Sequence, residues 1–545
     1  MLISRTYRTY LMLLTLFTTI GPSTAVAAEW QWSVADGNAR VYLWIPLDCA
    51  RIRGVVLANH NMIEQGIMEH PAMRKTLTEL GFAEVWAVPM LEHRFDFHKG
   101  AGEHFQRVID ALAAESGYRE LSMAPVVTLG HSASATWPWN FAAWDPGRTL
   151  CVLSVHGDAP QTNLTGYGGP NVDWGDRNID GVPALMVMSE HEWWEDRLTP
   201  LFKFTAKHPG APVSMLCDAG RGHFDFSDRL VDYLTMFIRK SAAARLPKTV
   251  GPLDAPVALR SVDPKDGWRM DRWRKEEPPT AAAAPYGQYS GEASQAVWCF
   301  DEEMAKATEA YYTTSRGKKP QLVAFTQADK VFAGEPAKPA FTAGEDGITF
   351  KVSAGFLNTV SGNGGNPANW AGAPNGSPIG HATGGGPVVL SRIVGPFAIV
   401  GPDTVRLQFD RAQSGQDGRR YDLWLLASHP GDTEYKPAVQ QGQVRANPNL
   451  KGQVQTIDFP AIADQPASVK SVPLAAQSSA GLPVKYYVRE GPAEIQGEQV
   501  VFTRIPPRSK FPLTVTVVGW QWGRSIEPKV QTATPVSRTF KLVVP

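Results

Sequence analysis

Apolar residues in the first half of the chain fall into short runs separated by longer segments of mixed character. A run of about four to eight apolar residues bounded by turn residues is typical of a strand buried on both faces of a parallel sheet. These runs predict the successive strands of one sheet. They are Gly54–Asn59, Ala83–Val88, Pro125–Leu129, Cys151–Val155, Ala184–Met188 and Val213–Cys217.

Helix-like segments lie between and after these runs, and a hairpin of Trp30–Ser33 and Ala39–Pro46 precedes them. Such alternation predicts a mostly parallel sheet with helices on both faces, an α/β fold class. In sheets of this kind, the active residues gather at the carboxyl ends of the strands. The predicted helices are Pro71–Leu80, Glu103–Ser116, Ala135–Trp144, Trp193–Lys207 and Asp225–Arg245.

A serine stands at one of these strand ends. The string Gly130-His131-Ser132-Ala133-Ser134 follows the run 125–129 and leads into the helix 135–144. A serine between small residues on a sharp strand-to-helix turn is a nucleophile elbow, which exposes its hydroxyl at the sheet edge. Ser132 is therefore the candidate nucleophile.

An acid and a histidine follow the next strand ends in the required order. Glu190 and Glu192 come directly after the run 184–188, and His223 comes shortly after the run 213–217. The order serine, acid, histidine resembles the α/β-hydrolase superfamily over residues of about 31–245. Ser134 departs from that pattern, because a glycine is usual at this position.

The resemblance implies a serine esterase with these residues in named roles. Ser132 would attack a carbonyl carbon, and His223 would take its proton. A glutamate would orient the histidine ring; the position of the acid in the family's loop favours Glu192, and Glu190 is the alternative. The backbone N–H groups of Ala133 and Met62 would hold the oxyanion. This chemistry requires no metal and no cofactor.

Aromatic and histidine side chains near these strand ends are candidates for substrate binding. Trp137 follows the nucleophile, Trp193 follows the acid, and His156 follows the run 151–155. Tryptophan rings bind sugars and aromatic acyl groups, although these same rings could instead pack the helices on which they lie. His131 is interpreted as structural.

Composition limits the class of protein. The chain has 545 residues with 53 basic and 53 acidic ones, so no nucleic-acid partner is expected. Residues 1–28 are typical of a signal peptide, with Arg5 and Arg8 before the apolar stretch Leu11–Ile20 and small residues at Ala25–Ala28. We therefore expect an exported bacterial protein, periplasmic or extracellular, with no membrane span after cleavage.

Four cysteines are few for an exported protein of this length. Cys151 and Cys217 fall in core strands that the usual strand order separates by about 9–10 Å, too far for a disulfide. They are expected to be buried thiols. Cys49 and Cys299 could either pair or remain free.

The composition changes after Pro247. Residues 248–300, with the run Pro278–Pro285, are typical of a linker. Residues 301–452 predict a β-rich domain of unknown role that opens with a helix, Asp301–Tyr312. Residues 453–545 show short strands at regular spacing and resemble the immunoglobulin-like β-sandwich modules of bacterial exported proteins. Residues 29–247 are then a catalytic domain that we expect to fold and act by itself.

These features together favour an exported serine esterase whose substrate is an acyl group on a polysaccharide. Two alternatives remain open. One is an exported peptidase or amidase on the same fold, and the other is a binding or adhesion protein whose hydrolase domain is inactive.

Overall fold

The computed structural model describes residues 29–165, 169–249, 251–361, 366–414 and 418–544. The predicted signal peptide lies outside them. Within these ranges, every helix is too short or too polar to cross a membrane.

An eight-stranded sheet forms the N-terminal part of the chain, with the strand order β1-β2-β4-β3-β5-β6-β7-β8. The strands from β4 to β8 are parallel, and only β1 and β2 run antiparallel to their neighbours. The strands are β1 (Trp32–Asp36), β2 (Ala39–Trp44), β3 (Gly54–Asn59), β4 (Phe82–Val88), β5 (Val126–His131), β6 (Thr149–Val155), β7 (Ala184–Ser189) and β8 (Val213–Asp218).

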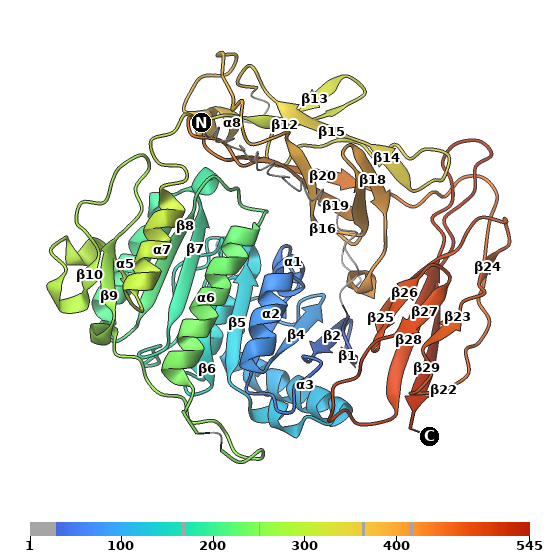
Figure 1. Cartoon of the computed structure of the whole chain (residues 1–545), viewed down its shortest axis with the longest axis horizontal. Coiled ribbons are helices and arrows are strands. Elements are labelled where there is room, and N and C mark those ends of the chain that lie inside the picture. Colours follow the sequence, from blue (N-terminus) through green and yellow to red (C-terminus); the bar gives the residue numbers. More distant parts are fainter. Residues whose placement is uncertain (1–28, 166–168, 250, 362–365, 415–417, 545) are drawn as a thin grey trace, which may run out of the picture.

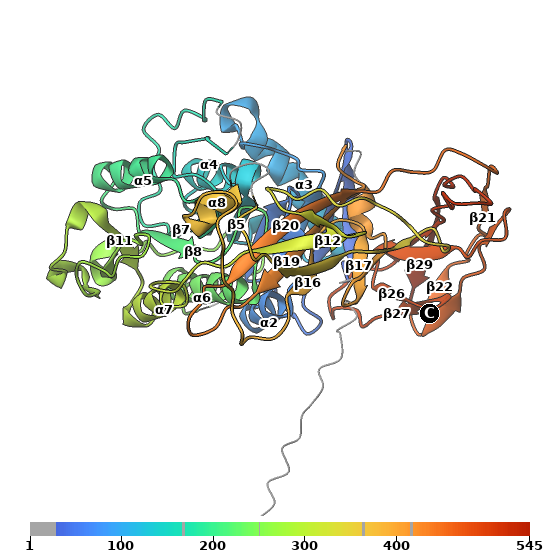
Figure 2. The same cartoon turned by 90° about the horizontal axis from the view of Figure 1, so that it is seen from above.

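Helices cover both faces of this sheet, which confirms the predicted α/β class. Helices α2 and α6 lie on one face, and α3, α4 and α5 lie on the other (Figures 1 and 2). Helix α2 begins at Pro71, and Gly81 directly after its last residue terminates it with a φ of 70°, which suits glycine. The helices are α1 (Glu64–Met68), α2 (Pro71–Leu80), α3 (Ala101–Ser116), α4 (Trp137–Trp144), α5 (Glu195–Lys207) and α6 (Asp228–Arg245).

The segment predicted as a linker is folded against the main sheet instead. Three short antiparallel strands, β9 (Trp268–Asp271), β10 (Ala284–Pro285) and β11 (Ala296–Cys299), form a sheet beside β8. The Ser214 hydroxyl on β8 donates to the Trp298 carbonyl at 2.7 Å. The linker prediction was wrong because the proline-rich segment also contains a few large apolar residues, such as Trp273, that are buried in the folded protein.

The next part of the chain is β-rich, as predicted, after one helix, α7 (Glu302–Tyr312). It forms three small antiparallel sheets that lie across the carboxyl edge of the main sheet (Figure 1). We call residues 313–452 the β domain; it also carries α8 (Asn366–Ala371). Its strands are β12 (Val323–Gln327), β13 (Lys330–Phe332), β14 (Thr349–Lys351), β15 (Ser353–Phe356), β16 (Val389–Val394), β17 (Phe397–Gly401), β18 (Thr404–Leu407), β19 (Asp422–His429) and β20 (Ala438–Arg445).

Two facing sheets make up the C-terminal part, and Phe502 on one contacts Phe540 on the other, with ring centroids 6.0 Å apart. The four-stranded sheet has the order β22-β29-β28-β25, the three-stranded sheet the order β23-β27-β26, and β21 pairs with β24. The immunoglobulin-like identity of this part remains a prediction. The strands are β21 (Ile457–Asp458), β22 (Gln465–Pro466), β23 (Ser471–Pro473), β24 (Gln477–Ser478), β25 (Lys485–Glu490), β26 (Ala493–Gln496), β27 (Gln499–Phe502), β28 (Leu513–Trp520) and β29 (Val536–Val543).

Polar contacts tie the three parts together. The buried Glu490 carboxylate of β25 accepts a hydrogen bond from Arg40 on β2 at 2.6 Å. Arg508 reaches Glu120 at the same distance. The Tyr312 hydroxyl of α7 accepts a hydrogen bond from the Cys217 amide on β8, the edge strand of the main sheet. All four cysteines lie in the described ranges and are buried free thiols, so Cys49 and Cys299 are unpaired.

The expectation that residues 29–247 fold and act alone stays a prediction, and these contacts argue against it. We predict that a fragment ending at Pro247 will aggregate or lack a cooperative thermal transition, because it exposes the surface of β8 that Trp298 and Tyr312 cover. Size-exclusion chromatography and thermal unfolding of the fragment beside the full chain would test this. A monodisperse fragment with a sharp transition would show that the later residues are dispensable for folding.

Candidate active site

The turn after β5 has the geometry of a nucleophile elbow. Ser132 follows the strand directly and has a φ of 53°, a strained value for a residue other than glycine. The chain passes so close to itself here that a Cβ on Gly130 would lie 2.1 Å from the Ser134 carbonyl oxygen. A glycine is therefore required at position 130, and the turn presents the Ser132 hydroxyl at the sheet edge.

Three side chains from three strand ends meet in one line of hydrogen bonds. The Ser132 Oγ lies 2.6 Å from His223 Nε2, and His223 Nδ1 contacts Glu192 Oε2. Because an ionised carboxylate can only accept, Nδ1 carries the proton and Nε2 accepts the hydrogen bond of the serine hydroxyl. The structure thus brings together the candidate nucleophile, base and acid.

The Glu192 carboxylate is held in its charged form. Burial alone would raise its pKa, but the charges of His223 and Arg197 outweigh burial and hold the pKa well below its ordinary value. The Arg197 guanidinium donates to Glu192 Oε2 at 3.0 Å and to Asp158 at 3.2 Å. Arg197, on α5, therefore both neutralises and orients the acid.

Glu190, the alternative acid, is buried and faces a different set of partners. It accepts hydrogen bonds from the Gly220 amide at 2.8 Å, the Ser315 hydroxyl at 3.1 Å and Lys436 Nζ at 3.0 Å. Burial would raise the pKa of Glu190, but the Lys436 charge lowers it. This carboxylate joins the acid loop to the histidine loop and to the β domain.

Two buried histidines hold the backbone of His223. Its carbonyl oxygen accepts hydrogen bonds from His131 Nε2 at 2.8 Å and from His156 Nδ1 at 2.9 Å. His156 Nε2 lies 3.3 Å from Asp218, whose other oxygen accepts a hydrogen bond from the Tyr311 hydroxyl. Both ring nitrogens of His156 therefore face acceptors. Burial would lower the pKa of His156, yet the hydrogen bond and charge of Asp218 raise it.

Two of the residues predicted to bind substrate are placed elsewhere. His156 has no exposed surface, because the histidine loop and Asp218 enclose it. Trp137 is 1% exposed and packs edge-on against Phe141 beneath the elbow. Both predictions were wrong, since a position near a strand end does not reveal which way the side chain points. Trp193 is half-buried against Trp273, with ring centroids 4.3 Å apart.

The loop predicted to supply an oxyanion donor is tied to a buried acid that sequence reasoning missed. The Met62 amide donates to Glu64 Oε2 at 2.7 Å, so it is directed into the protein. The Ala133 amide lies in the first turn of the short helix Ser132–Ser134, where N–H groups lack helical partners. The only feature of the sequence that could have pointed to Glu64 is its position, a few residues after the end of an apolar strand.

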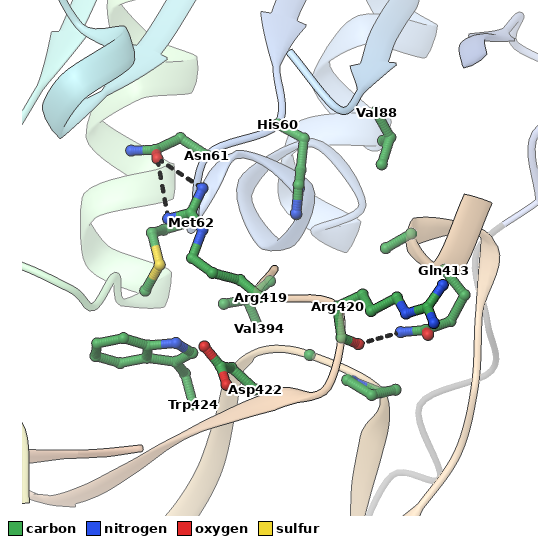
Figure 3. Close-up of a pocket in the computed structure, with 13 residues that line it drawn as sticks. His60, Asn61, Met62, Val88, Val394, Gln413, Arg419, Arg420, Asp422 and Trp424 are labelled. Carbon is green, nitrogen blue, oxygen red and sulfur yellow. Dashed lines mark hydrogen bonds between the residues drawn. The ribbon is translucent and has the colours of Figure 1, made fainter. Parts of the chain in front are cut away.

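A pocket lies between this loop and the β domain (Figure 3). Arg419 points at Asn61, with both guanidinium NH2 nitrogens 3.4 Å from the Asn61 side-chain oxygen. Trp424 forms another wall and contacts Phe224, the residue after His223, with ring centroids 5.0 Å apart. The lining residues are His60, Asn61, Met62, Val88, Val394, Gly395, Pro396, Ala412, Gln413, Arg419, Arg420, Asp422 and Trp424.

The β domain also braces the acid loop from above. The Trp370 ring of α8 stacks on His191 at 4.7 Å, and its Nε1 donates to the His191 carbonyl at 2.9 Å. Gln441 on β20 donates to Asp225 in the histidine loop at 2.9 Å. No motif in residues 301–452 pointed to this role, because the contacts join residues more than 170 positions apart.

No protein-family model matches this chain, and no curated protein matches it. Among solved structures, it resembles a monoglyceride lipase from Saccharomyces cerevisiae (13% identity, 40% of this chain, 97% of that chain, TM-score 0.28). It also resembles Est1E from Butyrivibrio proteoclasticus (14% identity, 40% and 100%, TM-score 0.27) and an S-formylglutathione hydrolase from Agrobacterium tumefaciens (15% identity, 38% and 93%, TM-score 0.28). At these values, the chemistry of the site rests on its own geometry.

The Glu190–Lys436 pair gives a pH-dependent prediction. Because the pKa of Glu190 is lowered in the folded protein, the pair stabilises the fold above the ordinary carboxyl pKa of 4.5, and this contribution is lost as the pH falls. We expect Glu190→Gln to lower the unfolding temperature by about 5 °C at pH 7, since it leaves a buried ammonium with one carboxylate fewer.

Differential scanning fluorimetry at pH 7 and at steps below pH 4.5 would test this. The difference in unfolding temperature between wild type and Glu190→Gln should become smaller as the pH is lowered below 4.5. Glu79→Gln is the matched control, because Glu79 pairs with Lys75 and Arg239 at the surface, where an ion pair contributes little. Equal effects of the two substitutions would contradict the stabilising role of Glu190.

Proposed function

We propose that this protein is an exported serine esterase that hydrolyses a carboxylic ester through an acyl-enzyme. The observation that carries the proposal is the line from Ser132 Oγ through His223 to Glu192, with the serine held at a φ of 53° on the elbow. Each group has the protonation state and the contact that its role requires.

In the first step, Ser132 Oγ attacks the ester carbonyl carbon and its proton moves to His223 Nε2. Glu192 stabilises the imidazolium that forms, and the Ala133 amide meets the negative carbonyl oxygen. The tetrahedral intermediate then collapses; the C–O bond breaks, and His223 returns its proton to the leaving alcohol. A water molecule repeats the sequence on the acyl-enzyme, releasing the carboxylic acid and restoring the serine.

Two features support an acylated glycan as the substrate. Trp194, two residues after the acid in the sequence, is 50% exposed, and an exposed aromatic ring is a surface on which a sugar ring can pack. The signal-like residues 1–28 favour export to a compartment where polysaccharides occur. The pocket between Met62 and Trp424 would receive one of the two groups that the ester joins.

Ser132→Ala tests the reaction class. The variant should lose hydrolysis of short acyl esters by about 10⁶-fold and lose labelling by a fluorophosphonate probe, with an unchanged unfolding temperature. The same assays on wild type should show faster turnover of acyl esters than of peptide anilides. Faster anilide turnover would favour the peptidase alternative, and an unlabelled wild type would favour a binding protein.

Glu192→Gln tests the acid. An amide at this position would stabilise the wrong histidine tautomer, so we expect the acylation rate to fall by about 10⁴-fold. The unfolding temperature should also fall, because the buried Arg197 guanidinium loses one of its two carboxylate partners. Pre-steady-state measurement of acyl-enzyme formation would give this rate. Glu190→Gln is the matched control, two residues away on the same loop, and should lower stability far more than rate. The reverse pattern would transfer the role to Glu190.

A further inference from the structure

Glu64 is a fully buried carboxylate that accepts four hydrogen bonds. Oε1 accepts from the His131 amide at 3.0 Å and from the Ser134 hydroxyl at 2.7 Å. Oε2 accepts from the Asn61 amide at 3.1 Å and from the Met62 amide at 2.7 Å. One side of the carboxylate therefore holds the nucleophile elbow, and the other holds the loop after β3.

The four contacts use the Glu64 side chain as a hydrogen-bond acceptor. Three of the four partners are backbone N–H groups, which only donate, and each carboxylate oxygen faces at least one of them. A proton on Oε2 would point at an N–H, whereas a proton on Oε1 could be directed only at the Ser134 hydroxyl. Burial outweighs the hydrogen bonds from Ser134 and the loop amides and raises the pKa of Glu64 above its ordinary value.

The two segments joined by Glu64 are those that border the reacting carbon. The elbow carries Ser132 and the Ala133 amide, and the loop 60–62 lines the pocket beside it. A second contact, from the Asn61 side-chain amide to the His131 carbonyl at 2.9 Å, runs between the same segments. Ser134, at the position where related elbows carry glycine, is used as a donor to Glu64.

We propose that Glu64 is the positioning residue that fixes the pocket-lining loop 60–62 against the nucleophile elbow. The inference rests on the proposed esterase function and deepens it. Glu64 does not touch the substrate; it acts through the backbone of Met62 and His131. Since a displacement of about 1 Å can cost about 10²-fold in rate, the loss of this carboxylate should appear in kcat rather than in KM.

Glu64→Gln is the first test. The Gln amide nitrogen must face at least one backbone N–H, so one of the two segments is pushed away. We expect kcat for a short acyl ester to fall about 10²-fold, with KM changed less than about threefold. The affinity for a boronic acid, which forms a tetrahedral adduct on the serine, should fall by a similar factor, because it depends on the same geometry.

The matched control is Glu84→Gln. Glu84 on β4 is also fully buried, but it pairs with Arg74 at 3.1 Å, away from the elbow. The Glu84→Gln variant should have a lower unfolding temperature, and its kcat and its affinity for the boronic acid should stay near the wild-type values. If Glu64→Gln keeps wild-type kcat, or loses kcat only as Glu84→Gln does, the positioning role is overturned.

Ser134→Ala keeps the inference testable if Glu64→Gln does not fold. It removes one of the four donors and should lower kcat severalfold without affecting KM; an unchanged kcat would contradict the inference. Failure of the proposed function looks different. Wild type would then hydrolyse no ester, and Ser132 would not react with fluorophosphonate, whereas failure of this inference alone leaves wild-type turnover and labelling intact.

Discussion

The position of the His223 ring is the constraint on which the whole site depends. Its two nitrogens must face Ser132 and Glu192 at once, and a loop between β8 and α6 carries it. A loop gains such precision only from contacts outside itself. Here, His131 and His156 both donate to the His223 carbonyl, and the ring is therefore held through its own backbone.

Buried carboxyl groups and their hydrogen-bond partners supply much of this rigidity. Charged groups removed from water destabilise a fold unless they are paired or fully hydrogen-bonded. Glu64 accepts hydrogen bonds from four donors. Glu190 pairs with Lys436, and Asp218 contacts both His156 and Tyr311. Such networks have few alternative arrangements, because any displacement leaves a charge unsatisfied. These buried groups lower the stability of the fold, but they restrict the site to one defined geometry.

The β domain contributes directly to the candidate active site. Lys436, Gln441 and Trp370 each contact a loop that follows a strand of the main sheet, and Trp424 lines the adjoining pocket. The geometry of the site therefore depends on both parts of the chain.

Local pattern determined the main sheet, the elbow and the order serine, glutamate, histidine, because strand periodicity and strand-end positions are properties of short segments. It left Glu190 and Glu192 both open as the acid, and only the structure shows which of them contacts His223. Only the tertiary structure decided which side chains face the substrate. His156 and Trp137 are buried, and Lys436 reaches the acid loop from 246 positions away. Side-chain direction and contacts between distant segments arise from packing, which no local pattern encodes.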